Sequence, residues 1–235
     1  MLILAFDSTA KAASVALTDG DRLLADFVCD NGLTHSEILL PMAEDALRRA
    51  KKSLSDVGLF AVNVGPGSFT GVRIGVSLVK GLAFGKNIPI APVSTLLSLA
   101  YNLSPMDGIL CPVMDARRSQ VYNALFRVQN GSLVRLTSDR AIALSDLRQE
   151  LLRDYPGETV RLVGDGYRVA AEALNDLPLA ETPALLLREN AYATALAALS
   201  MYENGETVTD AELLPVYLRM PQAERDRLGK SLSPS

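Results

Sequence analysis

The first thirty residues alternate between short apolar segments and polar turns, a pattern typical of strands in a half-buried sheet. Three such segments, Leu2–Asp7, Ala13–Thr18 and Arg22–Val28, have the length of strands. Asp19-Gly20, between the second and the third, is a strong signal for a two-residue hairpin turn. The chain is therefore predicted to open with an antiparallel meander.

A helix is predicted to follow. Thr34 and Glu37 have the spacing of a capping box, in which each side chain reaches the backbone of the other residue. Apolar residues then recur at helical spacing as far as about Lys52. They are Leu39, Met42, Ala46, Leu47 and Ala50. Because Ile38 and Leu40 widen the apolar surface beyond one face, this helix is predicted to have surface left to bury.

A glycine-rich segment joins a predicted strand, Leu59–Val64, to a second helix predicted from Val72 to about Phe84. Such turns often bind phosphate. The third glycine, Gly71, lies one residue late for a dinucleotide fingerprint, and no lysine follows as in a P-loop. Anion binding and close packing of strand on helix both stay open. The candidate anion or nucleotide residues are Asp7, Ser8, Thr9, Gly65, Gly67, Ser68, Thr70, Gly71 and Arg73.

The remaining pattern predicts an α/β protein with two mixed units. A strand at Ile88–Val93 and a helix capped by Ser94 complete the first unit, 1–103. The second unit, 104–220, has predicted strands and helices at Ile109–Met114, Gln120–Val128, Leu133–Thr137, Ser145 onward, Val160–Val163, Gly166–Leu174 and Asn190–Tyr202, then an extended piece at Leu214–Arg219. Residues 221–235 are rich in Pro, Ser and charge, so a flexible tail is predicted.

Composition narrows the classes of function. Of 235 residues, 49% are hydrophobic and 21% charged, as in a soluble protein with a core. A net charge of −4 predicts that any nucleic acid is bound only with a partner. No apolar run is long enough for a membrane span. Cys29 and Cys111 lie far apart, which favours a reducing cytoplasm.

The single histidine, His35, limits the chemistry further. A zinc site needs three or four ligands, and His35, Cys29 and Cys111 have no such spacing, so no metal is predicted. Since His35 lies in the first turn of the predicted helix, a role at the helix start is favoured over that of a catalytic base.

A second polar segment, Asp115-Ala116-Arg117-Arg118, follows the first strand of the second unit. Its two arginines can bind a carboxylate or a phosphate. They can equally pair with Asp115 and neighbouring acids at the surface. The residues alone do not separate these two readings.

These segments together resemble the bacterial TsaB (YeaZ) family over essentially the whole chain to about Arg219. The resemblance rests on Phe6–Thr9, Thr34–Glu37 with Leu40-Pro41, Gly65–Gly75, Asp115–Arg118 with Val121-Tyr122, and Pro215–Arg219. The chain departs from the family at Ser119-Gln120, where Gly-Glu is more frequent.

The resemblance implies an actin-like ATPase (ASKHA) fold, with two ribonuclease-H-like lobes whose mixed sheets are flanked by helices. It implies a scaffold or activating subunit for threonylcarbamoyl transfer to adenosine 37 of tRNAs that read ANN codons. The partners would be a TsaD-like catalytic subunit and a TsaE-like ATPase, with ATP used by the complex and tRNA bound only within it. A homodimer stays open.

The family also implies where the partner binds and why this chain is a pseudo-enzyme. Its two helices would pack against the same pair of a partner, through Ile38, Leu39, Met42, Ala46, Leu47, Val72, Gly75 and Val79. The TsaD-type relative holds its metal in a His-x-Glu-x-His-like segment. Here the corresponding positions are Thr95, Leu97 and Leu99, none of which can replace an imidazole.

Two other functions are open alternatives. One is a small actin-fold kinase of a sugar or a carboxylic acid, in which Asp7 would bind the metal and Asp115 would act as the catalytic base. The absence of a glycine after Asp7 argues against it. The other is a protease, which would depend on His35 alone.

Overall fold

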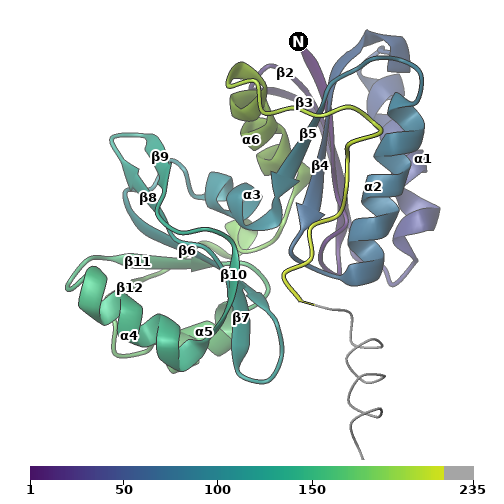
Figure 1. Cartoon of the computed structure of the whole chain (residues 1–235). Coiled ribbons are helices and arrows are strands. Elements are labelled where there is room, and N and C mark those ends of the chain that lie inside the picture. The colour runs from purple at the N-terminus through teal and green to yellow at the C-terminus, as the bar shows by residue number, and fades with distance from the viewer. Residues whose placement is uncertain (220–235) are drawn as a thin grey trace, which may run out of the picture.

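The computed structural model describes residues 1–219, so residue 220 and the predicted tail 221–235 lie outside it. Two lobes are built on one sheet each (Figure 1). The first contains β1 (Leu2–Asp7), β2 (Ala13–Asp19), β3 (Arg22–Cys29), α1 (His35–Arg49), η1 (Leu54–Asp56), β4 (Val57–Gly65), α2 (Phe69–Ala83), β5 (Ile90–Ser94) and α3 (Thr95–Asn102). The second contains β6 (Gly108–Asp115), β7 (Gln120–Asn123), β8 (Phe126–Gln129), β9 (Ser132–Arg135), β10 (Arg140–Ala143), α4 (Leu144–Asp154), β11 (Val160–Val163), α5 (Tyr167–Ala173), β12 (Leu179–Ala180) and η2 (Ala184–Leu186). Helix α6 (Ala191–Glu203) follows.

The two sheets repeat one plan. The first has the strand order β3-β2-β1-β4-β5, and the second has β10-β7-β6-β11-β12, with β8 and β9 paired beside β6. In each, the first strand of the lobe is antiparallel to the next strand in sequence and parallel to the strand on its other side. The predicted α/β class with two mixed sheets is confirmed.

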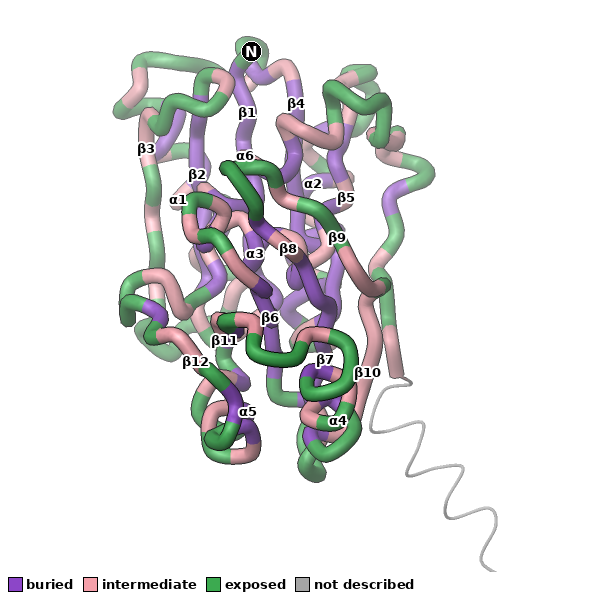
Figure 2. The backbone as a smooth tube through the Cα atoms, turned by 90° about the vertical axis from the view of Figure 1, so that its left-hand side faces the viewer, coloured by how far each residue is buried: buried purple, intermediate pink, exposed green. Residues whose placement is uncertain are grey.

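Helices and sheets alternate in layers. Leu4 and Phe6 of β1 pack toward α1 and α2, whereas Ile3 and Ala5 on the opposite face pack toward α6. Helix α3 covers one face of the second sheet, and α4 and α5 cover its other face. Figure 2 shows β1 and β2, among the innermost strands of the first sheet, as buried, and only Asp19 at the end of β2 is exposed. This double coverage explains why β1 reads as an unbroken apolar run.

Helix α6 corrects the predicted second unit, 104–220. This helix leaves the second lobe and packs on β1, β2 and β5 of the first. Residues 208–219, here called the strap, also return: Val208 bridges Ile90, and the Val216 amide donates to the Val64 carbonyl oxygen (2.8 Å). The first lobe is thus built from both ends of the chain.

Several element boundaries differ from the prediction. The segment Gln120–Val128 is two strands, because the chain turns after Asn123 and the Leu125 amide donates to Thr137 Oγ1 (2.8 Å). Helix α4 begins at Leu144, so Ser145 is not its cap, and the strand β10 before it was not predicted. β10 is only four residues long, and Ile142 is its one strongly apolar residue.

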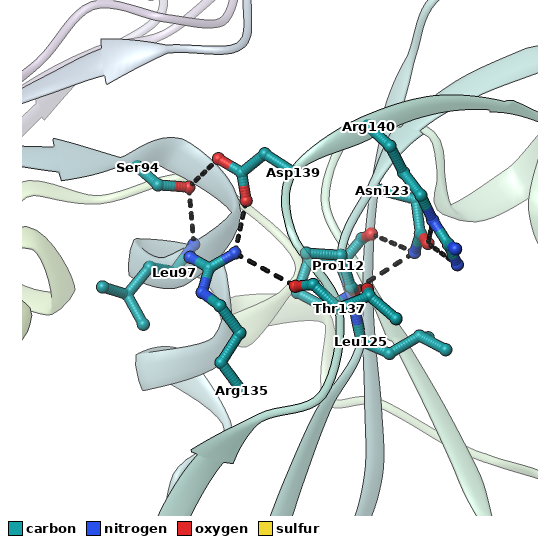
Figure 3. A network of polar contacts seen from close by, with 10 residues as sticks. Ser94, Leu97, Pro112, Asn123, Leu125, Arg135, Thr137, Asp139 and Arg140 are labelled. Carbon is teal, nitrogen blue, oxygen red and sulfur yellow. Dashed lines mark hydrogen bonds and ion pairs between the residues drawn. The ribbon is translucent and has the colours of Figure 1, made fainter.

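A polar bridge joins the lobes at the start of α3 (Figure 3). Ser94 Oγ caps the helix by accepting from the Leu97 amide (3.3 Å), as predicted, and also donates to Asp139 (2.5 Å). Arg135 holds the other oxygen of the Asp139 carboxylate. The end of β5 is therefore fixed to the second lobe.

Candidate functional site

The predicted Asp7–Thr9 site is a buried loop with its polar groups already satisfied. Asp7 Oδ1 accepts from the Thr9 amide (2.8 Å) and hydroxyl (2.7 Å), and Asp7 Oδ2 accepts from Asn63 Nδ2 (2.7 Å). Burial raises the pKa of Asp7, and these hydrogen bonds oppose the rise. Ser8 Oγ donates to the Gly71 carbonyl oxygen (2.8 Å), which joins this loop to α2.

The glycines of the predicted anion loop pack against the chain's own backbone. A Cβ on Gly67 would lie 2.5 Å from the Thr9 carbonyl oxygen, and one on Gly71 would lie 1.9 Å from that of Ser8. A Cβ on Gly65 would meet the Val216 carbonyl oxygen at 2.4 Å. Close packing therefore accounts for these glycines without a ligand. Anion binding stays a prediction.

Helix α2 begins inside this segment, earlier than predicted. Ser68 is its N-cap and accepts from the Gly71 amide (3.3 Å), so Phe69 and Thr70 are already helical. The Arg73 guanidinium lies 3.9 Å above the Phe69 ring, and its Nε donates to the Tyr217 hydroxyl (2.8 Å). Arg73 thus holds the strap and does not project into the loop.

A polar cleft of about 530 Å³ lies between the lobes. Its lining includes Thr9, Lys11, Gly67, Ser68, Phe69, Asp115, Arg117, Tyr122, Asp165, Tyr217 and Arg219. The Asp115 amide donates to Asp165 Oδ1 (3.0 Å), and the Arg117 amide donates to Asp115 Oδ1 (2.7 Å). Burial raises the pKa of Asp165. The cleft therefore carries both signs of charge.

The Asp115–Arg118 segment forms a left-handed turn. Arg117, Arg118 and Ser119 have φ values of 63°, 57° and 56°, a region that favours glycine. Arg219 of the strap donates to the Ala116 carbonyl oxygen (2.9 Å). The turn aims Arg117 at the cleft, so a role in binding an anion stays open, as does a surface role for Arg118.

An apolar groove runs between α1 and α2. It consists of two cavities of about 510 and 430 Å³ that share Leu40, a residue 40% exposed. The first is lined by His35, Ser36, Leu39, Leu40, Phe69, Thr70, Arg73, Ile74, Ser77 and Leu78. The second is lined by Leu4, Leu40, Ala43, Glu44, Leu47, Arg48, Lys52, Leu54 and Leu82. We call this surface the α1/α2 groove.

Most of the predicted interface residues are buried beneath the groove or form its floor. Leu39, Ala46, Leu47, Val72, Gly75 and Val79 are buried in the first lobe, and of these Leu39 and Leu47 also line the two cavities. Ile38 and Met42 are partly buried against the core, as are Ile74 and Leu78, which line the groove and were not in the predicted set. The exposed lining residue Leu40 was also outside that set, and the interface itself stays a prediction. Helical spacing finds an apolar stripe but does not tell its two edges apart.

His35 lies at the start of α1, as predicted. The Thr34 amide donates to Glu37 Oε2 (2.9 Å), which confirms the carboxylate half of the capping box. The Thr34 hydroxyl, which donates to the same oxygen (2.7 Å), and then the Thr34 amide lower the pKa of Glu37. His35 Nε2 lies 3.0 Å from the Ala10 carbonyl oxygen, so the ring nitrogen that a protease would use faces a backbone acceptor.

The positions that correspond to a TsaD-type metal site do not fit a metal. Thr95 and Leu99 are fully buried in α3, and Leu97 packs between two apolar clusters. Within residues 1–219, no group of three or more His, Cys, Asp or Glu side chains is arranged to hold a metal ion. The Cys111 thiol is buried, which raises its pKa to about 12.

Two buried polar residues near the cleft were missed by the sequence analysis. Asn63 connects Asp7 to Thr194, whose hydroxyl donates to Asn63 Oδ1 (3.3 Å). Glu189 lies where the chain re-enters the first lobe and is only 7% exposed. Asn63 stands out as the only amide in an apolar strand, a signal available in the sequence; nothing around Glu189 marks it.

Comparison with known proteins gives consistent matches. The family model described as TsaD, tRNA N6-adenosine threonylcarbamoyltransferase, matches residues 32–199. The tRNA threonylcarbamoyladenosine biosynthesis protein TsaB of Bacillus subtilis is 33% identical over 95% of this chain and 96% of that protein. The protein of the same name from Escherichia coli is 32% identical over 98% and 100%.

Solved structures agree in fold. A Pseudomonas aeruginosa protein described as similar to peptidase YEAZ has a TM-score of 0.77 and 30% identity, covering 93% of this chain and 99% of that one. The ROK hexokinase of Thermus thermophilus has a TM-score of 0.50, with 14% identity and coverage of 87% and 100%, and so shows the fold alone. The actin-like fold is confirmed. No helix within residues 1–219 has the length and apolar character needed to cross a bilayer.

Proposed function

The chain belongs to the TsaB (YeaZ) family, and from this premise we propose that it is a non-catalytic, activating subunit in tRNA threonylcarbamoyladenosine biosynthesis. It acts by binding a TsaD-like catalytic subunit through the α1/α2 groove. The curated relatives over nearly the full chain support the pathway, and the open groove supports the mode of action.

The groove is the observation that carries the proposal. Leu40, Ile74 and Leu78 line it; Leu40 is 40% exposed, and Ile74 and Leu78 are partly exposed. An apolar groove between two helices accepts an apolar helical face, since partner side chains then fill the gap that the two helices leave. A TsaD-like partner with the same helix pair would offer that face.

The non-catalytic role rests on the donor chemistry. Thr95, Leu97 and Leu99 offer no ligand set for a TsaD-type metal, and His35 faces a carbonyl oxygen. The kinase alternative is not favoured, because Asp7 is 1% exposed and both of its oxygens already accept hydrogen bonds from Thr9 or Asn63. Catalysis by the partner leaves this chain the task of stabilising the partner's active form.

The other components follow from family membership. We include in the proposal a TsaE-like ATPase that uses ATP within the complex, transfer to adenosine 37 of ANN-reading tRNAs, and a cytoplasmic location. The net charge of −4 supports tRNA binding within the complex and only weak binding by this chain alone. The groove also suits a homodimer before the partner arrives.

The test is binding of the TsaD-like protein from the same cell to groove variants. Leu40→Glu and Leu78→Glu place a carboxylate in the seam, and a desolvated charge should weaken binding roughly tenfold or more. Modification of tRNA by the reconstituted complex should fall with it. Isothermal titration calorimetry measures the first effect and an RNA modification assay the second.

A matched control tests whether the same change outside the groove also weakens partner binding. Leu152→Glu makes the same change on α4, where Leu152 is 43% exposed against 40% for Leu40. It should bind the partner normally. Leu39→Glu is unsuitable, because Leu39 is 1% exposed and its replacement disrupts the core. Unaltered affinity of folded Leu40→Glu and Leu78→Glu chains would show that the interface lies elsewhere.

A further inference from the structure

The lobes are joined by two chain crossings, from α3 to β6 and from η2 to α6. Side-chain amides tie the crossings together. Asn190 Nδ2 donates to Asn102 Oδ1 (2.6 Å), and Asn102 Nδ2 donates to the carbonyl oxygens of Leu186 (3.3 Å) and Arg188 (2.8 Å). The two crossings are therefore linked to each other, and we call this linked pair the hinge.

Glu189 lies inside this hinge, between Arg188 and the α6 cap Asn190. It is 7% exposed, and its Oε1 is buried without a hydrogen-bond partner among residues 1–219. Arg188 does not compensate it, because its side chain is 69% exposed and points toward Asp30 (3.8 Å). A charged carboxylate in such a place is strongly disfavoured.

The charged groups that face Glu189 are acids from both lobes. Burial raises the pKa of Glu189 most, and Asp7 at the end of β1 and Asp165 after β11 raise it further, to about 8. Backbone amides of Glu189 and Asp165 oppose the rise. The like charge of Asp115 contributes to the raised pKa of Asp165, whereas the opposite charge of His35 opposes the rise in the pKa of Asp7.

The helices packed on the hinge add no compensating charge. Helix α3 has no acidic or basic residue, and α6 has only Glu203, at its far end. Their other titratable groups are tyrosines, of which Tyr192 donates to the Asp21 carbonyl oxygen (3.0 Å). A proton on Glu189 is the remaining way to neutralise it.

We propose that Glu189 is a proton-operated latch of the hinge between the lobes. Protonated, it stays buried between the ends of β1 and β11 and holds the lobes closed. When the proton passes to water, the carboxylate is repelled by Asp7 and Asp165 and moves into solvent, which opens the cleft. The opening of the cleft is thereby linked to pH near and above neutrality.

The direction of the stability change follows from linkage. The pKa of Glu189 is raised from 4.5 to about 8 on folding, so the folded chain holds an extra proton between these values. The stability that Glu189 contributes is present below the lower value and is lost as the pH rises toward the higher one. Relative to a neutral amide at this position, the unfolding constant should rise about tenfold per pH unit in this window.

The experiment compares the full chain with Glu189→Gln, which fixes the side chain in a neutral form. Glu203→Gln on α6 is the matched control for loss of an exposed carboxylate. Urea unfolding is measured between about pH 5 and pH 9, together with the radius of gyration by small-angle X-ray scattering. The radius should grow above about pH 8 in the parent and in Glu203→Gln, and stay constant in Glu189→Gln.

Carbon-13 NMR of the glutamate carboxyls in the parent chain provides a readout that needs no variant. One carboxyl should titrate near pH 8. The proposal is overturned if every glutamate titrates at ordinary values, if Glu189→Gln unfolds with the parent's pH dependence, or if the radius of gyration stays constant through the titration.

Discussion

Both lobes end their first strand on an aspartate, yet the two aspartates have opposite surroundings. Asp7, at the end of β1, is 1% exposed and bonded on both oxygens by Thr9 and Asn63. Asp115, at the end of β6, is exposed and accepts from the amide of a left-handed turn. The same strand order thus supports a closed polar core in one lobe and an open polar surface in the other.

Glycine turns follow a parallel strand in both lobes, and both turns are closely packed. In the first lobe, a Cβ on Gly71, in the turn after β4, would lie 1.9 Å from the Ser8 carbonyl oxygen. In the second, after β11, a Cβ on Gly164 would lie 2.3 Å from the Val113 carbonyl oxygen, and one on Gly166 would lie 3.0 Å from it. Close packing of backbone is therefore common to the two turns, and Gly166 is the position with the smaller clash.

The largest expected effect is a glycine substitution. Gly71→Ala should destabilise the chain by about 4 kcal/mol, because backbone must move to admit the methyl group. Gly166→Ala, the matched change in the second lobe, should cost about 1 kcal/mol. Urea unfolding with circular dichroism measures both. Equal losses would contradict the difference in packing between these two glycine positions.

The next comparison concerns the one buried asparagine of each lobe. Asn63→Ala removes the donor to Asp7 Oδ2 and should cost about 3 kcal/mol, because a buried carboxylate oxygen is left unpaired. Asn123→Ala should lower the free energy of unfolding by about 1.5 kcal/mol. The loss is smaller because Arg140, which donates to Asn123, keeps its ion pair with Glu150 (2.7 Å). Thermal unfolding compares them; a larger loss in Asn123→Ala would refute this ranking.

The smallest expected effect is a gain in stability. Ser119 has a φ of 56°, so Ser119→Gly should stabilise the chain by about 0.5–1 kcal/mol. Ser145→Gly, in α4 of the same lobe, should have the opposite sign because glycine weakens a helix. Chemical denaturation of both variants decides whether the left-handed turn is strained, and a loss of stability in Ser119→Gly would show that it is not.

Much of the local structure was predictable from short patterns. The strands β1–β3, the start of α1 at His35 and the Ser94 cap all depend on residues close in sequence. Which face of a helix packs against the core depends on contacts with distant residues. Leu39 and Leu40 are equally apolar, so the sequence alone does not tell which of them is buried. The sequence therefore indicated the helix pair but not which of its apolar residues are exposed, such as Leu40.

The candidate site was harder to predict for the same reason. The glycine segment had two consistent readings, and only the position of Ser8 and Thr9, about sixty residues away in the chain, favours close packing. The hinge around Glu189 depends on α6 crossing back to the first lobe. An alanine-rich helix carries no mark of the sheet that it covers, so this return was missed.

That return determines the order in which a nascent chain can fold. The second lobe is continuous in sequence, whereas the first needs α6 and the strap, which leave the ribosome after the second lobe. Until they arrive, Ile3, Ala5 and Leu59 lack α6 over them, and Lys80 lacks the carbonyl oxygen of Leu213 (2.9 Å). The earliest strands made are thus the last to be covered, and a stalled or shortened product would expose their apolar face to chaperones and proteases.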